Sequence, residues 1–323
     1  MNRILVTGGK GFLGSYVVRL LKAKGYKNVF SFSSQQYDLV NMADILKLFR
    51  EFCPDIVLHL AARVGGIGIN QKNPASFFYD NLMMGIQLME VARQQGVQKF
   101  VTVGTVCTYP EHTPVPFKES NLWNSYPEKT NAPYGLAKKM LLVQGQAYHQ
   151  QYGFNAIYLI PPNLYGPGDN FNPKSSHVAA ALIKRCIEAV EFNQTELEVW
   201  GTGRANREFL YIEDAAQAIV MAMENYDQPE PMNIGSGIEV SIRDLIHLIA
   251  ELTGFTGKIV WNTSKPDGQQ RRCLDISKAK QLLGFEAKTN LKQGLQQTID
   301  WYKNLMPIDG GDKRRFGTLD VEQ

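Results

Sequence analysis

The chain has 323 residues, of which 44% are hydrophobic and 20% charged, as in an ordinary globular protein. Its 34 basic and 31 acidic residues leave a net charge of +3, so the charge predicts no nucleic-acid partner and leaves room only for a local basic pocket that binds a phosphorylated ligand. The sequence has no signal-peptide pattern and no apolar run of about 18 residues, so we expect no membrane association and a cytoplasmic location. Its four cysteines are far apart and form no CxxC pair, which argues against zinc, and against a disulfide framework.

The first half of the chain alternates short apolar runs with amphipathic stretches. The runs are β-branched or aromatic without clear polar alternation, as in strands covered on both faces of a parallel sheet; they are residues 4–7, 28–32, 55–60, 99–103 and 155–160. Helices are predicted between them, at residues 13–24, 41–52, 74–95 and 133–152. This order predicts an α/β fold with a Rossmann-type, doubly wound parallel sheet.

The rhythm becomes irregular after Pro161. Helices are predicted at residues 177–192, 213–224, 242–253, 277–283 and 291–305, with short strands at 198–200 and 258–261. We interpret this half as a smaller, partly interleaved C-terminal α/β lobe for the substrate. The expected NADP(H)-binding domain is 1–162 plus about 207–231, the substrate lobe about 163–206 and 232–306, and 307–323 a weakly ordered tail.

A glycine-rich turn follows the first predicted strand and opens the first helix. Gly8, Gly11 and Gly14 have the spacing of a GxxGxxG turn, a variant of the dinucleotide-binding fingerprint. Its exposed amides and the positive end of the helix would hold the cofactor phosphates. A simple tight turn is the alternative, but the flanking strand and helix favour dinucleotide binding. The predicted cofactor-binding residues here are Gly8, Gly9, Lys10, Gly11, Phe12, Leu13 and Gly14.

The end of the second predicted strand indicates which nicotinamide cofactor is bound. An NAD enzyme commonly has Asp or Glu there to bind the ribose 2′-hydroxyl. This chain has Ser33 and Ser34 and no acid before Asp38. Two hydroxyls suit a 2′-phosphate, and Lys10 could supply the opposing charge, although it could equally be a solvated loop residue. The pattern favours NADP(H) over NAD(H).

Tyr134 and Lys138 form a YxxxK pair at the start of a predicted helix. The i, i+4 spacing puts the phenol and the ammonium on one helix face, where a cation favours the phenolate and makes tyrosine a better proton shuttle. Alone, the pair could be an ordinary exposed helix face.

Thr105 follows the fourth predicted strand, and its hydroxyl could bind a substrate carbonyl. In an extended segment Cys107 would share the side of Thr105, unless it is a small buried hydrophobe.

Several blocks, in order along the chain, strongly resemble the GDP-L-fucose synthase family of extended short-chain dehydrogenases. They include Gly104-Thr105-Val106-Cys107-Thr108-Tyr109-Pro110, Thr130-Asn131-Ala132-Pro133-Tyr134 with Lys138, Pro162-Asn163-Leu164-Tyr165-Gly166-Pro167, Ala61-Ala62-Arg63-Val64-Gly65-Gly66-Ile67, Asp169-Asn170-Phe171 with Ser176-His177-Val178, and Lys265-Pro266-Asp267-Gly268. The resemblance spans about residues 3 to 305, and several blocks are specific to this subfamily.

The resemblance implies a two-stage reaction: epimerisation of GDP-4-keto-6-deoxy-D-mannose at C3 and C5, then reduction of the C4 ketone with NADPH. Cys107 would be the base, His177 the acid on the opposite face, and Tyr134 the proton donor to the C4 oxygen. Lys138 would hold the cofactor ribose, and Thr105 would orient the carbonyl. The implied substrate-binding residues are Asn163, His177, Arg185, Trp200, Arg207 and Lys265; Asn163 would contact substrate or nicotinamide, and Arg185 and Arg207 the GDP diphosphate.

Simpler interpretations of these residues remain open. From the residues alone, His177 is better explained as a helix cap, and each arginine as part of a surface salt bridge. The family usually has Ser-Ser where this chain has Thr105-Val106, which leaves the reaction type intact and the sugar less certain.

The alternatives for the whole chain are a 4-reductase or epimerase for another 4-keto sugar, including a deoxyheptose, and a non-catalytic nucleotide sensor. The sensor would be expected to lack Tyr134 or Lys138. By resemblance we also expect a homodimer formed through the helices at 74–95 and 133–152.

Overall fold

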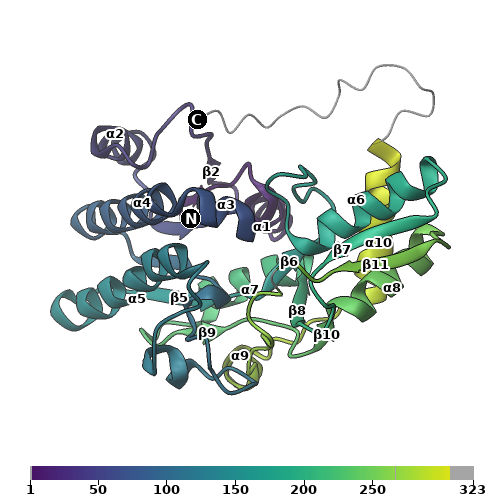
Figure 1. Ribbon diagram of the computed structural model, residues 1–323. Coiled ribbons are helices and arrows are strands. Elements are labelled where there is room, and N and C mark those ends of the chain that lie inside the picture. Colours follow the sequence, from purple (N-terminus) through teal and green to yellow (C-terminus); the bar gives the residue numbers. More distant parts are fainter. Residues whose placement is uncertain (1, 266, 306–323) are drawn as a thin grey trace.

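The computed structural model describes residues 2–265 and 267–305 (Figure 1). The weakly ordered tail expected at 307–323 lies outside the described residues. No helix of the described part is long and apolar enough to cross a membrane.

A six-stranded parallel sheet in the order β2-β1-β3-β4-β5-β9 forms the centre of the larger lobe. Its strands are β1 (Ile4–Thr7), β2 (Val29–Ser31), β3 (Ile56–His59), β4 (Lys99–Val103), β5 (Ala156–Ile160) and β9 (Met232–Asn233). The chain passes from β1 outward to β2 and then returns to the other side of β1 with β3. This reversal is the switch point at which doubly wound sheets bind their ligands, beside the carboxyl ends of the strands. The predicted fold class is confirmed.

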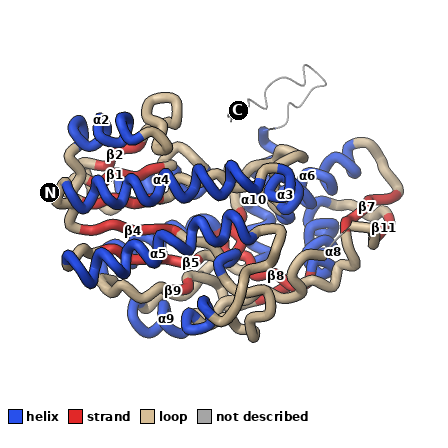
Figure 2. Tube along the Cα trace, turned by 60° about the vertical axis from the view of Figure 1, so that its left-hand side comes forward, coloured by secondary structure: helices blue, strands red, loops and turns tan. Residues whose placement is uncertain are grey.

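Helices cover both faces of this sheet. Leu5 and Val57 point to the face that packs under α2 (Met42–Phe52), α4 (Pro74–Gln94) and α5 (Ala132–Tyr152). Their neighbours Val6 and Leu58 point to the opposite face, under α1 (Phe12–Ala23) and α7 (Ile212–Asn225). Because side chains alternate across a strand, burial on both faces requires the uninterrupted apolar runs seen in the sequence. Figure 2 shows α4 and α5 lying side by side over the sheet.

The smaller lobe contains two short sheets and the remaining long helices. One sheet has the order β10-β8-β6 and the other pairs β11 with β7. Its elements are β6 (Asn163–Tyr165), α6 (Val178–Glu191), β7 (Glu196–Trp200), β8 (Asn206–Tyr211), β10 (Glu239–Ser241), α8 (Ile242–Thr253), β11 (Lys258–Asn262) and α10 (Leu291–Leu305). The other elements are α3 (Ile67–Lys72), the 3₁₀ helices η1 (Val106–Thr108) and η2 (Glu119–Trp123), and α9 (Ser277–Leu283).

The two lobes interleave differently from the expected division at about residues 207 and 232. Strand β8 lies in the small sheet, whereas the helix that follows it, α7, packs on α1 of the large lobe. Strand β9 pairs with β5 in the large sheet, although the expected boundary left residues 232–233 in the substrate lobe. A two-residue strand has no periodicity of its own, so only tertiary pairing reveals it.

A buried polar cluster joins the segments where the lobes meet. The Glu208 carboxylate is fully buried and accepts hydrogen bonds from the backbone nitrogens of Ser236 (2.6 Å), Gly237 (2.8 Å) and Leu274 (2.7 Å). Burial raises the pKa of Glu208, and these amides oppose the rise. The segment around residue 274 is thereby held against β8.

Asn233 holds the same segment against the loop after β4. Its amide donates to the carbonyls of Phe117 (2.8 Å) and Asp275 (3.0 Å) and accepts from the Tyr109 hydroxyl (2.7 Å). Asn233 is fully buried, so the loss of any of these bonds would leave a desolvated polar group without a partner. Together these three hydrogen bonds fix residues 109 and 117 next to residue 275.

Candidate active site

The predicted glycine turn joins β1 to α1 at the switch point. Gly8 has φ +66°, a left-handed conformation that favours glycine, and the amide of Gly11 donates to its carbonyl at 2.9 Å. A Cβ on Gly14 would lie 2.0 Å from the Gly8 oxygen, so the turn and the first helical turn can pack this closely only without side chains. Gly11 is the N-cap of α1 and makes no side-chain cap bond, and Phe12 and Leu13 begin the helix. The first helical amides are therefore free to bind phosphate.

Donors from two elements converge beyond the end of β2. The side-chain oxygen of Gln36 accepts from the Ser33 amide (3.0 Å), the Ser33 hydroxyl (3.4 Å) and the Lys10 ammonium (3.4 Å). Lys10 comes from the glycine turn, and the exposed Ser34 follows Ser33 in the same loop. The structure thus brings Lys10 and Ser33 together at Gln36, a residue that the sequence interpretation did not include.

The loop after β4 carries Thr105 and Cys107, but its geometry differs from the expected extended segment. Only Thr105 is extended (φ −159°, ψ 148°), and Val106–Thr108 form the 3₁₀ helix η1. The Thr105 hydroxyl caps this helix by accepting from the Cys107 amide at 3.2 Å. The two side chains are therefore neighbours because of a cap, and not because of strand alternation. Threonine is a good N-cap residue, so the local sequence contained this signal.

Tyr134 and Lys138 lie on the first turns of α5; Lys138 is buried and Tyr134 is partly buried. Burial raises the pKa of Tyr134, the charge of Cys107 adds to the rise, and a hydrogen bond with the Thr105 side chain opposes it. Desolvation of the phenolate dominates within the protein, and the lowering expected from Lys138 together with the nicotinamide charge stays a prediction. Burial also lowers the pKa of Lys138 to about 8. Tyr134 therefore keeps its proton at neutral pH, which suits a proton donor.

The close approach of α5 to η1 brings Tyr134 next to Thr105 and Cys107. A Cβ on Gly135 would lie 2.3 Å from the Cys107 carbonyl oxygen and 2.9 Å from its carbonyl carbon. The helix can start this close to the loop only because residue 135 has no side chain. Glu128 fixes the preceding turn by accepting from Asn131 at 2.7 Å and from the Thr130 amide at 3.0 Å.

His177 stands at the N-cap of α6, but its ring makes no cap hydrogen bond. The alternative that it serves as a helix cap is therefore wrong, and the imidazole is available for another role. Burial lowers its pKa. The preceding loop is held against the Gly65-Gly66 segment, since the Gly66 amide donates to the Ser175 carbonyl at 3.3 Å.

Arg207 on β8 is almost buried, and the guanidinium group of Arg272 lies near its own. It is 8% exposed and donates to the carbonyls of Asn206 (2.7 Å) and Asp267 (3.0 Å), and no salt bridge of the described residues involves it. Burial, together with the nearby charge of Arg272, lowers its pKa to about 10. The surface salt bridge considered for Arg207 is wrong. Arg272 was not predicted as a site residue, although it follows the Lys265–Gly268 block closely in the sequence.

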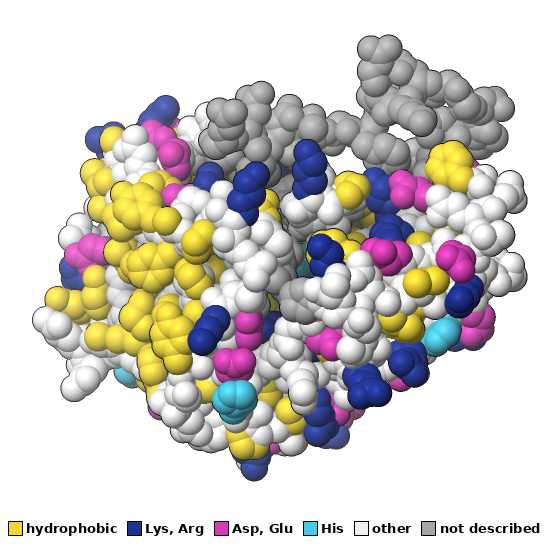
Figure 3. All heavy atoms as spheres, in the orientation of Figure 1, with side chains coloured by type: hydrophobic (Ala, Val, Ile, Leu, Met, Phe, Trp, Pro, Cys, Tyr) yellow, Lys and Arg dark blue, Asp and Glu magenta, His cyan; other side chains and the backbone are white. Residues whose placement is uncertain are grey.

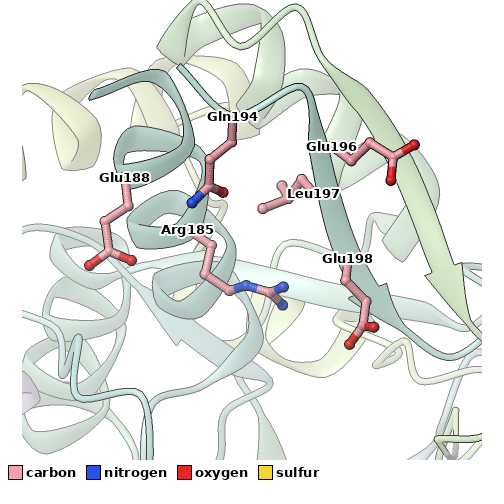
Figure 4. A pocket seen from close by; sticks show the side chains of 6 residues that line it. All are labelled: Arg185, Glu188, Gln194, Glu196, Leu197 and Glu198. Atoms are coloured by element: carbon pink, nitrogen blue, oxygen red, sulfur yellow. The ribbon is translucent and has the colours of Figure 1, made fainter. Parts of the chain in front are cut away.

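Arg185 lies apart from Arg207, in a cavity of about 340 Å³ between α6 and β7 (Figure 4). The side chain extends from α6 toward Glu198 on β7. Within the described chain neither Arg185 nor Glu198 forms a salt bridge, whereas Glu188 and Glu196 lie 3.8 Å from Lys184 and Lys258. A donor and an acceptor therefore face the cavity without partners. Its lining residues are Arg185, Glu188, Gln194, Glu196, Leu197 and Glu198.

The remaining predicted substrate residues lie on the small lobe. Trp200 ends β7 with 58% of its surface exposed, and the Lys265 ammonium lies 5.1 Å from its ring centroid. Asn163 begins β6, and its amide donates to the Glu208 carbonyl at 3.1 Å. Trp200 and Lys265 thus form one exposed pair, and Asn163 is fixed beside β8.

A model of the NAD dependent epimerase/dehydratase family matches residues 4–235. The chain belongs to this family. It is 42% identical over 93% of its length to GDP-L-fucose synthase 1 of Arabidopsis thaliana, covering 93% of that protein. It is 35% identical to the GDP-L-fucose synthase of Escherichia coli K12, covering 93% of this chain and 96% of that one. The resemblance seen in the sequence and the prediction of an enzyme are confirmed.

Solved structures of this epimerase/dehydratase family superpose closely. A GDP-L-fucose synthetase from Naegleria fowleri bound to NADP matches with TM-score 0.85 and 31% identity, over 93% of this chain and 94% of that one. A GDP-6-OMe-4-keto-L-xylo-heptose reductase from Campylobacter jejuni matches with TM-score 0.88 and 31% identity, over 94% and 98%. Both kinds of sugar nucleotide named in the sequence interpretation therefore occur among the relatives.

The contact at Gly135 predicts a stability effect. Gly135→Ala should lower the free energy of unfolding by about 1–3 kcal/mol, because the added methyl meets fixed backbone in a packed region. Gly68→Ala is the matched control, since a Cβ at Gly68 in α3 meets nothing within 4 Å. Denaturant melts of the three proteins measure the difference; equal stability of Gly135→Ala and wild type would show that η1 moves away from α5 at no cost.

Proposed function

We propose that the chain is a nucleotide-sugar 3,5-epimerase/4-reductase that converts GDP-4-keto-6-deoxy-D-mannose to GDP-L-fucose with NADPH. The observation that carries this proposal is the grouping of Thr105, Cys107 and Tyr134 against the start of α5. A simple reductase needs the hydroxyl and the phenol but has no use for the thiol beside them. The names of the curated relatives support the same activity.

In the first stage Cys107 acts as the base and His177 as the acid. The 4-keto group makes the protons on C3 and C5 acidic, because the electron pair left by either proton is delocalised onto the C4 oxygen as an enolate. Cys107 takes the proton from one face, and His177 returns a proton to the other face of the same carbon. Hydroxyl donors such as Thr105 and Tyr134 stabilise the negative oxygen as it develops.

In the second stage Tyr134 protonates the C4 oxygen. Bound NADPH supplies the hydride for C4. The raised pKa of Tyr134 keeps its proton in place until the alkoxide oxygen forms, and that oxygen is the stronger base. Lys138, one helical turn further along α5, holds the cofactor ribose. The amides that follow Gly8 and Gly11 hold the pyrophosphate, where the turn leaves room for no side chain.

The choice of NADPH over NADH rests on the donors around Gln36. A 2′-phosphate offers the same kind of acceptor as the Gln36 oxygen, with more negative charge, to Ser33 and Lys10. Ser34 adds a second hydroxyl to this set. Two related structures were solved with NADP bound, those of the Naegleria fowleri synthetase and of the Campylobacter jejuni GDP-mannoheptose C4 reductase.

We place the two ends of GDP in different parts of the site. Arg207 binds the diphosphate, because its buried guanidinium has no carboxylate partner among the described residues. The cavity at Arg185 contains three carboxylates, which would repel a diphosphate. A guanine base suits it better, since Arg185 can donate to O6 and N7 while Glu198 accepts from N1–H and the 2-amino group. The expected contact of Arg185 with the diphosphate is therefore replaced by one with the base.

We also propose a homodimer formed through α4 and α5. Apolar side chains gather over these two helices on the left of Figure 3. They include Tyr79 (55% exposed) and Phe78 (39%) on α4 and Val143 (42%) on α5. A face of this kind is costly to leave in water, and two copies related by a twofold axis would bury it in a four-helix contact.

A different 4-keto sugar is the second candidate. The Campylobacter jejuni relatives include a heptose reductase that superposes as closely as the fucose-forming enzymes. Thr105 and Val106 stand where the family usually has two serines, and the methyl group of Thr105 reduces the space for the sugar. The reaction type is common to both candidates.

The first prediction concerns the division of labour. Wild-type protein with NADPH and GDP-4-keto-6-deoxy-mannose should lose the absorbance of reduced nicotinamide and yield GDP-L-fucose. In D₂O, Cys107→Ser should block deuterium incorporation at C3 and C5, whereas Tyr134→Phe should keep exchange and lose reduction by about 10²–10⁴-fold. Unchanged exchange in Cys107→Ser would remove the base role. Turnover with another 4-keto sugar only, from a panel of such substrates, would favour the second candidate.

The second prediction concerns the guanine pocket. Glu198→Gln should weaken GDP binding about tenfold, or about 1.4 kcal/mol, and should reduce the preference for GDP over inosine diphosphate, which lacks the 2-amino group. Isothermal titration with both nucleotides measures it, with Glu213→Gln as an exposed control. If the cavity held the diphosphate, loss of a carboxylate would strengthen GDP binding instead.

The third prediction concerns assembly. Tyr79→Glu should convert the dimer to a monomer, because it buries an unpaired charge in the contact, and Phe192→Glu at an exposed site at the end of α6 should not. Light scattering after gel filtration gives the mass. A wild-type monomer at micromolar concentration would contradict the proposed dimer.

A further inference from the structure

Arg272 touches the sulfur of Cys107. Its Nη1 lies 3.6 Å from Sγ and donates to it, and only 8% of the arginine is exposed. A second donor, Nε, binds the side-chain oxygen of Gln269 at 2.7 Å. The guanidinium therefore has two fixed partners and a small range of positions.

Gln269 anchors this arginine to the Cys107 loop. Its amide nitrogen donates to the carbonyls of Glu111 (2.6 Å) and Pro110 (3.4 Å), a few residues after the cysteine. The buried bonds of Glu208 and Asn233 hold residues 274 and 275 in place from the other side. Arg272 is thus carried by a segment that is fixed on both sides of it.

The charged and titratable groups that act on this thiol come from three other elements. Arg207 on β8 and Arg272 are cations that act on each other, and Arg207 also feels the charge of Cys107. Tyr134 on α5 is a neutral phenol at neutral pH. Glu128 acts on both arginines, but its oxygens already accept from Thr130 and Asn131. Positive charge therefore predominates, and of these groups Arg272 donates a hydrogen bond to the sulfur.

We propose that Arg272 is a positioning residue that orients the Cys107 sulfur, through the hydrogen bond from Nη1 to Sγ, to accept the C3 and C5 protons; this inference rests on the base role given to Cys107 in the proposed function. The thiolate, and not the thiol, can take a proton, and a guanidinium N–H stabilises its charge and aims its lone pair. On proton transfer an S–H bond forms, the C–H bond breaks, and its electron pair moves onto the C4 oxygen. The thiol proton is then lost to water, which restores the thiolate, while His177 protonates the opposite face.

Alkylation of the thiol tests the contact without any substrate. Full-length protein is treated with iodoacetamide at neutral pH, and the rate at each cysteine is followed by peptide mass spectrometry. Cys53 is exposed and serves as the internal reference, while Cys186 and Cys273 are buried and report any unfolding. Arg272→Met should lower the rate at Cys107 relative to Cys53 about tenfold, as expected for loss of a charge-assisted hydrogen bond. Arg272→Lys, which keeps the charge, should recover much of it.

An unchanged or higher relative rate at Cys107 in Arg272→Met would overturn the proposal. If that variant exposes Cys186 and Cys273, Gln269→Leu replaces it: this change leaves the arginine in the chain and releases it from Gln269, and it should lower the Cys107 rate in the same direction. An unaltered rate in a folded Gln269→Leu protein would then contradict the positioning role.

Kinetics separates this role from binding of the diphosphate. With substrate in D₂O, Arg272→Met should lower kcat for deuterium exchange and leave KM nearly unchanged. A raised KM with unchanged kcat would assign Arg272 to the diphosphate and overturn the inference. Because alkylation uses no substrate, failure of the proposed sugar reaction in wild-type protein is recognised independently of the Arg272–Cys107 result.

Discussion

The arrangement of the site depends on the buried hydrogen bonds of Glu208 and Asn233. These two side chains bind the backbone of residues 117, 236–237 and 274–275, which are far apart in the sequence, and the hydroxyl of Tyr109. A buried carboxylate is tolerated only when its oxygens are fully satisfied, so the segments have little freedom to separate. As a result, Arg207, Arg272 and Cys107 are held in one place although they come from different lobes.

Much of the large lobe could be predicted from the sequence. Buried parallel strands leave uninterrupted apolar runs, the glycine turn identifies the switch point, and Tyr134 and Lys138 belong to one helix, so their proximity needs no tertiary information. The small strands β6, β8, β9 and β10 were not predicted. Their existence depends on pairing partners that are distant in the chain.

The site itself was predicted less completely, for physical reasons that differ between residues. Arg272 is one of two adjacent arginines, and only burial separates it from an ordinary surface residue such as Arg271, which pairs with Glu239. We expected the pKa of Tyr134 to fall because of the nearby lysine and the nicotinamide, whereas burial in the protein raises it. Desolvation cannot be seen in the local spacing of residues. Arg185 falls one or two turns from His177 on α6, yet it faces a separate cavity lined by residues of β7.

The missing side chain at Gly135 has a consequence for how this enzyme family diversifies. Cys107 on η1 and Tyr134 on α5, the proposed base and the proposed proton donor, belong to segments whose backbones pack directly against each other at Gly135. Loops elsewhere in the chain can therefore vary to admit a longer or differently branched carbohydrate without moving η1 relative to α5. Selection can act on substrate shape and on catalysis separately, and a heptose and a hexose can be processed on the same frame.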